Sequence, residues 1–435
     1  MERTITTDVA IIGAGPAGSI AGAWLSQQGR DVHCFERGWF PRFVIGESLL
    51  PRCNQLLDEV GMLDAVKKRG YLVKPGAAFL RGDEVARFTF AEGLDGDFPD
   101  TYQVPRDDFD QTLATEARRH GAKIHFGQQV ESVSFDDGVE LTVKDVTTDE
   151  VTVVRAKYLM DCSGYGRVLP RLLDLNRPST LPPRAAIFTQ VEGDHRPEGD
   201  LEGEIWITVH PENGWQWTIP FSNGRTSIGA VVDMDFFDAL EGSMEQKFWT
   251  LINAEPNNAN RMRDAVVVRP VAHMTAWSTK VERLYGDNQP WVVAGNAGDF
   301  LDPIFSSGVA LALESSLLAA KVVHRILDGD DPNWQDDYLA PMHRGLEVFR
   351  AFVISWYSGQ LPDIFFSNVY PPRLKNRVTS ILGGNVTRTD NGLVMRPVQM
   401  LDQVHKGLAF KIGRENPDSE GLVTKPVSPL GEAEV

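Results

Sequence analysis

The sequence predicts an α/β fold with a Rossmann-like first domain, an inserted antiparallel β-sheet and a helical C-terminal extension. The first domain is indicated by a glycine-rich turn, residues 13–18, between an apolar strand and a small-residue helix. The sheet is indicated by four segments of alternating polar and apolar residues within 185–232. The extension is indicated by aromatic helical stretches after residue 331. The 435 residues are enough for several domain-sized units.

Charge and cysteine content exclude several classes of partner. Asp and Glu number 60 and Lys and Arg number 43, which gives a formal net charge of −17. Because an acidic chain repels phosphate backbones and anionic lipid surfaces, we expect no nucleic-acid or membrane partner. The three cysteines form no CxxC motif, which favours a reducing compartment. No signal peptide precedes the first strand, and charged residues interrupt the apolar run 309–323, so we expect a cytoplasmic protein.

The first elements along the chain form a β-α-β unit. Asp8–Ile12 is an apolar strand, and a small-residue helix follows it to about Gln28, where Gly29 ends it. Asp31–Phe35 is the second strand. This order is typical of a dinucleotide-binding domain.

The glycine-rich turn of this unit has the spacing of a dinucleotide site. Gly13 permits the tight turn, Gly15 lets the backbone approach a pyrophosphate, and Gly18 lets the helix pack close to the strand. The N-terminus of the helix offers free N–H groups to an anion. Glu36, at the end of the second strand, is placed to accept hydrogen bonds from ribose hydroxyls. The strand-turn-helix context makes this motif more specific than the glycines alone.

Later elements extend this framework. We expect a helix over Asp107–His120 and short alternating strands over Lys123–Asp161. An antiparallel sheet is expected from the segments Ala185–Val191, Glu204–His210, Trp215–Pro220 and Thr226–Val232. Trp291–Gly295 is a buried strand, and a long helix follows Gly308.

These elements suggest a division of the chain into four parts. The first part of the nucleotide domain is 1–180, with an intervening substrate-side segment near 72–104. The antiparallel sheet is 181–270, the second part of the nucleotide domain is 271–330, and the C-terminal helical region is 331–435. A polar tail begins at about residue 414, where we expect disorder.

Three segments point to FAD as the dinucleotide. No second GxGxxG occurs, so a built-in nicotinamide site has no support. Tyr158–Gly164 and Val292–Gly298 resemble the later fingerprints of FAD proteins of the glutathione-reductase type, with Asn296 where Asp is usual. Arg106 lies in a segment that resembles the one reaching the flavin–pyrophosphate region. The expected FAD-binding residues are Gly13, Gly15, Pro16, Ala17, Gly18, Glu36, Arg37, Arg42, Ile45, Ser48, Arg106, Val130, Asp161, Asn296, Pro303 and Val309.

Three further segments resemble the flavin-dependent halogenases, over most of residues 5–330. Phe40–Pro51 is similar to the halogenase loop that straps the flavin, and we call it the strap. Gly214–Pro220 contains the WxWxIP signature of that family. Asp302–Gly308 is similar to its halide-binding turn. The resemblance implies a Rossmann-like FAD domain and oxidative halogenation.

The resemblance assigns roles to residues of this chain. Lys74 matches the position of the catalytic lysine, and backbone N–H groups of Ser307 and Gly308 would hold the halide. The signature residues Trp215, Trp217, Ile219 and Pro220 would form a wall that keeps substrate away from the flavin. Taken singly, each feature has a structural explanation: a solvated lysine, a serine helix cap and tryptophans in a sheet core.

The implied reaction uses two protein components. FADH2 from a separate NAD(P)H-dependent flavin reductase, O2 and chloride or bromide would give hypohalous acid, which Lys74 would direct to an electron-rich aromatic substrate. Tryptophan halogenases carry Glu where this chain has Phe305, so we expect a small indole, phenol or pyrrole substrate. No metal-binding motif occurs in the sequence.

Two other functions stay open at this point. A single-component FAD hydroxylase would use the same cofactor site and insert oxygen into an aromatic substrate. A flavin-binding protein without turnover would need neither Lys74 nor the paired tryptophans. Dependence of the product mass on halide separates the halogenase from the hydroxylase.

Overall fold

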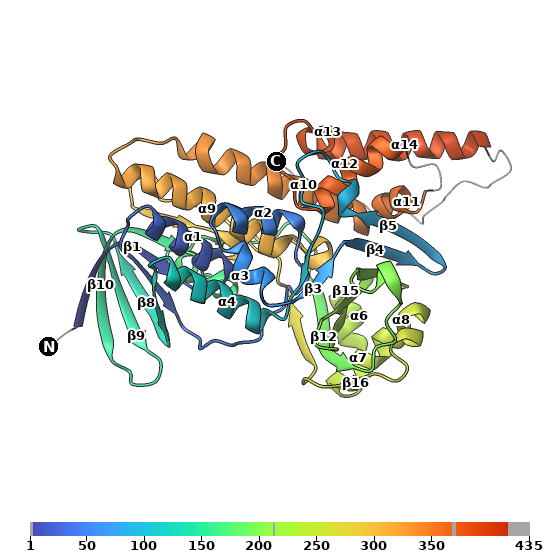
Figure 1. Ribbon diagram of the computed structural model, residues 1–435, viewed down its shortest axis with the longest axis horizontal. Helices are drawn as coiled ribbons and strands as arrows, with labels where there is room; N and C mark the ends of the chain where they lie inside the picture. The colour runs from blue at the N-terminus through green and yellow to red at the C-terminus, as the bar shows by residue number, and fades with distance from the viewer. Residues whose placement is uncertain (1–2, 212–213, 368–370, 416–435) are drawn as a thin grey trace.

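Two large β-sheets and a C-terminal helical region make up the molecule (Figure 1). The computed structural model describes residues 3–211, 214–367 and 371–415. The first sheet lies on the left of Figure 1 and the second on the right, and the helices that follow residue 340 run along the top. The predicted combination of an α/β domain, an inserted sheet and a helical extension is confirmed.

The first sheet is the Rossmann-like sheet. Its strand order is β7 (Lys123–Phe126), β2 (Val32–Glu36), β1 (Arg3–Ile12), β10 (Val151–Asp161), β9 (Val139–Asp145) and β8 (Gln128–Ser134). The strands β7, β2, β1 and β10 are parallel, and β19 (Trp291–Val293) adds to β10 in the same direction. The strands β8, β9 and β10 are antiparallel. The carboxyl ends of the parallel strands therefore meet at one edge, where ligands bind in such sheets.

Helix α1 (Pro16–Gln27) follows β1 and packs against α4 (Arg106–Arg119) and α9 (Ser307–Leu327). Pro16 begins α1, a position where its missing N–H costs nothing. A Cβ at Gly22 would lie 3.2 Å from the sulfur of Cys34 on β2, so the small residue lets α1 pack closely on that strand. The hydroxyl of Ser316 on α9 donates a hydrogen bond to the carbonyl oxygen of Ala17 at 2.7 Å, which holds α9 close to the glycine-rich turn.

The second sheet contains the four predicted strands, in the order β12 (Arg184–Glu192), β15 (Thr226–Asp233), β14 (Gly214–Pro220) and β13 (Ile205–His210). The sheet is larger than predicted. β4 (Gly76–Arg81) pairs in parallel with β13, and β5 (Glu84–Thr89) pairs with β4. β16 (Val266–Val267) and β17 (Ala272–Thr275) pair with β12. Because β4 is a short run without strict alternation, the sequence did not reveal its partner.

Alternate residues of the second sheet face different neighbours. Ala185 and Ile187 pack in a small core with the helices α6 (Met234–Ala239), α7 (Met244–Asn253) and α8 (Pro256–Arg261), whereas Ala186 and Phe188 belong to the main core. The sequence analysis predicted no helix in this region. The available signal was the capping box of α7, in which Ser243 accepts a hydrogen bond from the N–H of Gln246.

The remaining elements connect and cover the two sheets. The connecting elements are α2 (Pro51–Glu59), α3 (Leu63–Lys67), β3 (Leu72–Lys74), β6 (Thr101–Gln103), α5 (Val168–Leu172), β11 (Asn176–Arg177) and β18 (Lys280–Val281). The C-terminal region consists of α10 (Ala340–Tyr357), α11 (Gln360–Phe365), α12 (Pro372–Leu382), α13 (Gly392–Met395) and α14 (Pro397–Glu415). The expected disorder of the tail falls largely on 416–435, which lie outside the described residues.

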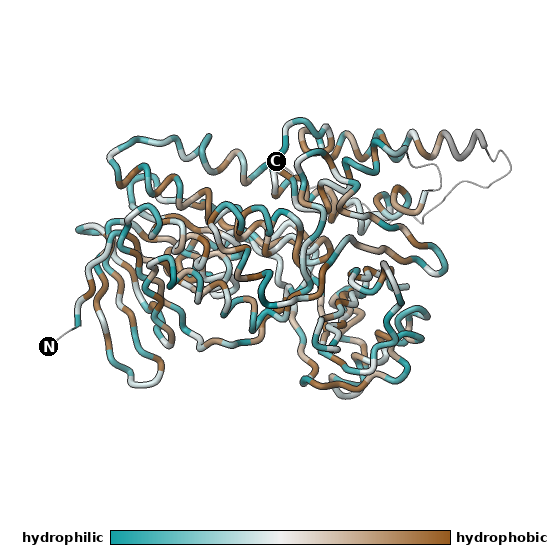
Figure 2. Tube along the Cα trace, in the orientation of Figure 1, coloured by the Kyte–Doolittle hydropathy of each residue, from teal (hydrophilic) through white to brown (hydrophobic). Residues whose placement is uncertain are grey.

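Hydrophobic stretches lie mainly in the strands and in the helices beside them, while several outer loops are hydrophilic (Figure 2). No helix in the described part of the chain is both long and apolar enough to cross a membrane. The same part of the chain contains no cluster of His, Cys, Asp or Glu that could hold a metal ion.

Candidate active site

A cavity of about 720 Å³ lies at the carboxyl ends of β1, β2 and β10, and we call it the cofactor groove. Most of the predicted FAD-binding residues line it: Gly13, Gly15, Pro16, Ala17, Glu36, Arg37, Arg42, Ile45, Arg106, Val130, Asn296 and Val309. The segments 128–129 and 162–166 also line it. Residues 162–164 belong to the predicted fingerprint Tyr158–Gly164, whereas 128–129 and 165–166 were not predicted. The groove therefore brings together residues from distant parts of the chain at one sheet edge.

The glycine-rich turn is too tight for any side chain at two positions. Gly13 has a φ of +93°, and a Cβ there would lie 2.6 Å from the carbonyl oxygen of Cys162. A Cβ at Gly18 would lie 2.0 Å from the carbonyl oxygen of Gly13. Gly18 itself does not line the groove; it lets α1 begin directly beneath the turn. The bare backbone at the start of α1 is suited to a pyrophosphate.

Glu36 and Arg42 lie at the same end of the groove. The carboxylate of Glu36 accepts hydrogen bonds from the N–H groups of Ala14 at 3.0 Å and Gly38 at 2.9 Å. Arg42 lies with its Nε 3.8 Å from this carboxylate, and its side chain is partly exposed. Glu36 thus fixes the turn that it faces, while Arg42 supplies positive charge to a groove in an acidic protein.

Asp161 and Arg106 contact protein groups. Asp161 is fully buried, does not line the groove, and accepts hydrogen bonds from the N–H groups of Ser163 at 2.8 Å and Leu169 at 2.7 Å. Burial raises its pKa. It therefore orients the segment 162–166, which does line the groove. Arg106 lines the groove but donates to Asp110 and to two strap carbonyls, so it holds the strap in place.

The groove fits FAD. Its volume lies within the range of about 300–1,000 Å³ that is typical of ligand sites. Missing side chains at Gly13 and Gly15 leave backbone accessible, and the first residues of α1 line the groove, where the N-terminus of the helix would suit a pyrophosphate.

A smaller cavity of about 90 Å³ continues from the groove, and we call it the inner chamber. The two cavities share six lining residues: Ile45, Arg106, Tyr165, Asn296, Gly308 and Val309. Two predicted FAD-binding residues, Ser48 and Pro303, line the chamber and not the groove. The chamber therefore lies between the cofactor groove and the second sheet.

The N-terminus of α9 opens into the chamber without a side-chain cap. Ser306 precedes the helix in a left-handed conformation, with a φ of +56°, and its side chain makes no capping hydrogen bond. The structure thus removes the interpretation of this serine as an ordinary helix cap. Gly308 lines both cavities, whereas Ser307 is buried and lines neither. First-turn N–H groups and the helix dipole favour an anion here.

The predicted tryptophan wall forms one side of the chamber. Trp215, Trp217 and Ile219 line it, and the centroids of the two indole rings lie 5.7 Å apart. Trp217 lies flat on the sheet over Gly229, where a Cβ would come within 2.4 Å of its ring. Pro220 is buried at the end of β14 and does not line the chamber. The two tryptophans share a face because the residues of a strand alternate.

Glu47 is a chamber residue that the sequence analysis did not single out. Only 1% of its surface is exposed, and its Oε1 accepts a hydrogen bond from Nε2 of Gln190 at 2.8 Å. Its Oε2 has no hydrogen-bond partner. Burial raises its pKa to about 7. The sequence feature that could have identified Glu47 is that it is the one carboxylic acid in the strap.

Lys74 is buried behind the strap and lines neither the cofactor groove nor the inner chamber. Its Nζ donates a hydrogen bond to the carbonyl oxygen of Leu49 at 2.8 Å, one residue beyond Ser48 of the chamber. The ring of Phe90 lies 5.3 Å from the Nζ. Burial lowers the pKa of Lys74 to about 7. The amine is thus close to its neutral form but separated from the chamber by the strap.

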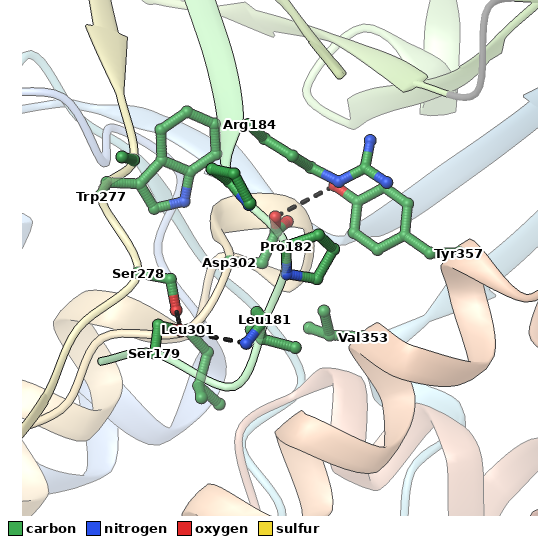
Figure 3. Close-up of a pocket in the computed structure, with 12 residues that line it drawn as sticks. Ser179, Leu181, Pro182, Arg184, Trp277, Ser278, Leu301, Asp302, Val353 and Tyr357 are labelled. Carbon is green, nitrogen blue, oxygen red and sulfur yellow. Dashed lines mark hydrogen bonds between the residues drawn. The ribbon is translucent and has the colours of Figure 1, made fainter. Parts of the chain in front are cut away.

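A third cavity of about 260 Å³, the side cavity, was not predicted (Figure 3). Trp277 lines both it and the chamber. Tyr357 accepts a hydrogen bond from Nε1 of Trp215 at 2.9 Å and donates one to Asp302 at 3.0 Å. The guanidinium of Arg184 lies 3.5 Å above the ring of Tyr357. The residues that line the side cavity come from four distant segments, so no sequence spacing joins them.

Comparisons with known proteins agree with this geometry. The FAD binding domain family model matches residues 6–337. The chain is 30% identical to a 1H-pyrrole-2-carbonyl-(peptidyl-carrier protein) brominase of Pseudoalteromonas luteoviolacea (strain 2ta16), over 88% of this chain and 93% of that protein. It is 30% identical to a tryptophan 2-halogenase of Chondromyces crocatus, over 76% of this chain and 63% of that protein.

Solved structures show the same architecture. A flavoprotein/dehydrogenase from Cytophaga hutchinsonii superposes with a TM-score of 0.90 at 38% identity, covering 94% of this chain and all of that chain. The flavin-dependent brominase Bmp2 superposes with a TM-score of 0.81 at 26% identity, covering 92% of this chain and 99% of that chain. The similarity therefore includes the C-terminal helices as well as the cofactor groove.

Proposed function

This chain belongs to the flavin-dependent halogenases, within the FAD binding domain family, and we propose that it is a two-component enzyme that halogenates an electron-rich aromatic compound. A separate NAD(P)H-dependent reductase would supply FADH2, and O2 and chloride or bromide would be the co-substrates. The substrate would be an indole, a phenol or a pyrrole. The names of the relatives, a pyrrole brominase and a tryptophan halogenase, support this substrate class.

One observation carries this proposal: the groove that fits FAD continues, past the uncapped N-terminus of α9, into a chamber walled by Trp215 and Trp217. Bound FAD in its reduced form would supply the electrons that activate O2. The backbone of Ser307 and Gly308 would hold the halide beside it. The tryptophan wall would keep a substrate-sized aromatic compound out of this space, because the chamber holds only about 90 Å³.

Lys74 would pass the halogen to the substrate. A neutral amine reacts with hypohalous acid to give a haloamine and water, and the haloamine then gives the halogenated aromatic compound and the free amine. The lowered pKa of Lys74 favours the neutral amine that this step needs. Because Nζ donates to the carbonyl of Leu49, the strap must move away before the halogen reaches it.

Phe305 supports a substrate other than free tryptophan. Its ring packs against Phe352 at 5.9 Å and Trp356 at 6.3 Å, between centroids. An aromatic cluster thus occupies the place where the tryptophan halogenases carry a carboxylate. We expect neutral, compact aromatic substrates to be favoured over free tryptophan.

The proposal is tested with purified enzyme, a flavin reductase, NADH, FAD and bromide, incubated with separate indole, phenol and pyrrole compounds. We expect products whose isotope pattern shows bromine and which disappear when bromide is left out. Oxygenated products that form equally well without halide would replace this proposal with a hydroxylase. Absence of oxygen consumption with reduced FAD would replace it with a flavin-binding protein that lacks turnover.

A further inference from the structure

Glu47 and Ser48 of the strap share three features, burial, a place in the chamber lining and a side-chain oxygen without a partner, but only Glu47 is a carboxylic acid. Its carboxyl group is buried, it lines the inner chamber beside Asn296 and Gly308, and its Oε2 has no hydrogen-bond partner. A buried polar atom without a partner costs about 1–3 kcal/mol. A carboxyl group kept buried in the wall of the chamber therefore calls for a chemical role.

The proposed reaction requires such a group because it consumes a proton. Reduced FAD, O2, halide and one proton give oxidised FAD, hypohalous acid and water: FADH2 + O2 + X⁻ + H⁺ → FAD + HOX + H2O. The two electrons lost by FADH2 and the two lost by the halide reduce O2. The proton has to be delivered inside a chamber that the tryptophan wall closes on one side.

We propose that Glu47 is the acid that delivers this proton, through its unpartnered Oε2, while the halide is oxidised in the inner chamber. This proposal rests on the proposed halogenase function and adds a catalytic group to it. After the transfer, the Glu47 carboxylate takes up a proton from water before the next turnover. A neutral acid also serves the halide better than a carboxylate, because a second negative charge in so small a space would repel it.

The groups that surround Glu47 keep both protonation states accessible. Gln190 on β12 donates a hydrogen bond to Oε1 of Glu47, and both this bond and the nearby hydroxyl of Ser227 on β15 favour the carboxylate. On α4, Arg106 favours the carboxylate and Asp107 disfavours it. Arg106 is already bonded to Asp110 and to the strap carbonyls, so it does not form an ion pair with Glu47. The effect of burial on the pKa of Glu47 is therefore larger than that of these neighbours, and it raises the pKa to about 7. An acid that titrates near neutral pH can both give and regain a proton.

The principal test is Glu47→Gln in the full-length holoenzyme, with Glu255→Gln as the matched control. Glu255 is also buried, but it caps α8 and does not line the chamber. We expect Glu47→Gln to bind FAD and consume O2 while the brominated product per O2 falls by ~10²–10⁴-fold. The O2 that is consumed should appear as hydrogen peroxide, since FADH2 + O2 → FAD + H2O2 needs no halide. Glu255→Gln should couple O2 to bromination as the wild type does.

A second measurement does not depend on turnover. Infrared difference spectra of the oxidised holoenzyme, recorded between pH 6 and pH 8, should show the C=O band of a protonated carboxyl group that titrates near pH 7. The band should be lost in Glu47→Gln and kept in Glu255→Gln. In Gln190→Leu the pKa should rise, because the hydrogen bond of Gln190 lowers it, and the decline of bromination with pH should move in the same direction.

The outcomes separate this proposal from the one on which it rests. If the wild type brominates and Glu47→Gln brominates equally well per O2, Glu47 is not the acid. If Glu47→Gln fails to fold, an unshifted band and pH profile in Gln190→Leu overturns the proposal instead. If the wild type itself produces no halogenated compound while it consumes O2, the halogenase function has failed, and a titrating Glu47 band would then belong to another oxidative reaction.

Discussion

The cofactor groove and the inner chamber meet at Asn296 and Gly308, but backbone atoms form the groove where side chains form the chamber. The groove exposes backbone, and its turn depends on the missing side chains of Gly13 and Gly18. The chamber is enclosed by side chains, the indoles of the tryptophan wall above all, and contains a carboxyl oxygen without a partner. A backbone-built site binds one kind of group wherever the motif occurs, whereas a side-chain-built site decides which reaction follows.

The largest expected effect is a loss of halogenation with FAD binding unchanged. Lys74→Ala should lower halogenation by ~10²–10⁴-fold, because the amine that would carry the halogen is lost. FAD binding, measured by flavin fluorescence, should not change, since Lys74 does not line the groove. Lys74→Arg should not restore activity, because a guanidinium stays charged.

The exposed Lys68→Ala is the control for this substitution and should halogenate normally. Normal activity in Lys74→Ala would remove the lysine from the proposed mechanism. Loss of FAD from Lys74→Ala would show instead that the hydrogen bond to Leu49 supports the strap, and with it the groove.

A second expected effect concerns pH and uses the buried charge of Lys74. Its pKa is about 7 in the folded protein against a usual value of 10.5, so between these values the unfolded chain binds a proton that the folded chain lacks. The wild type should therefore lose stability relative to Lys74→Met as the pH falls from about 10 to 7, by at most about 1.4 kcal/mol for each pH unit. Below about pH 7 the difference should be constant. Denaturant unfolding of both proteins at pH 9, 8, 7 and 6 measures this, and a difference that does not vary with pH would contradict it.

A third expected effect is weaker FAD binding in the groove. Gly18→Ala should weaken FAD binding by about 5- to 150-fold, because the added methyl group meets the carbonyl of Gly13 and relieving such a clash costs ~1–3 kcal/mol. Gly29→Ala is the matched control: Gly29 has a φ of +81° with no atom near its Cβ position. It should cost ~1–2 kcal/mol of stability and leave FAD titrations unchanged. Equal FAD affinity in both variants would show that the turn is not the binding element.

The smallest expected effect tests the hydrogen bonds behind the wall. Tyr357→Phe should lower the free energy of unfolding by about 1 kcal/mol for the lost hydrogen bonds. The loss should be larger at pH 8 than at pH 5, because the hydroxyl favours the ionised form of Asp302, whose pKa burial raises to about 6. Tyr338→Phe removes a buried hydroxyl that donates to a backbone carbonyl, so its loss should not depend on pH. A similar pH response in both variants would contradict the role of Asp302.

The sequence alone could predict the backbone-built part of the molecule. The β-α-β unit, the glycine-rich turn and the four strands of the second sheet follow from local periodicity, which is a property of neighbouring residues. The partnership of β4 with β13 is a contact over long separation, and short runs carry no signal for it. The sequence also indicated Trp215 and Trp217 as neighbours on one face, because they are two residues apart.

Residues whose importance depends on burial could not be found in this way. Glu47 lies in the strap that the sequence analysis identified, but its burial and its unpartnered oxygen depend on the packing of β12 and β15. The position of Lys74 could be expected from a resemblance, but its separation from the chamber by Leu49 could not. The residues of the side cavity come from four segments, 179–184, 276–278, 301–302 and 353–357, and no motif spans them.

The hydroxyl of Tyr357 also affects which chimeras of this chain and its relatives should be stable. It joins the indole of Trp215 in the second sheet to the carboxyl group of Asp302 before α9, across sequence separations of 142 and 55 residues. The C-terminal helices therefore cannot be replaced by those of a relative without affecting the second sheet and the segment before α9. A chimera that replaces only the residues after 331 breaks both bonds unless the incoming helix carries a hydroxyl at the place of Tyr357. A chimera that lacks this hydroxyl should lose about 1 kcal/mol of stability, as expected for Tyr357→Phe.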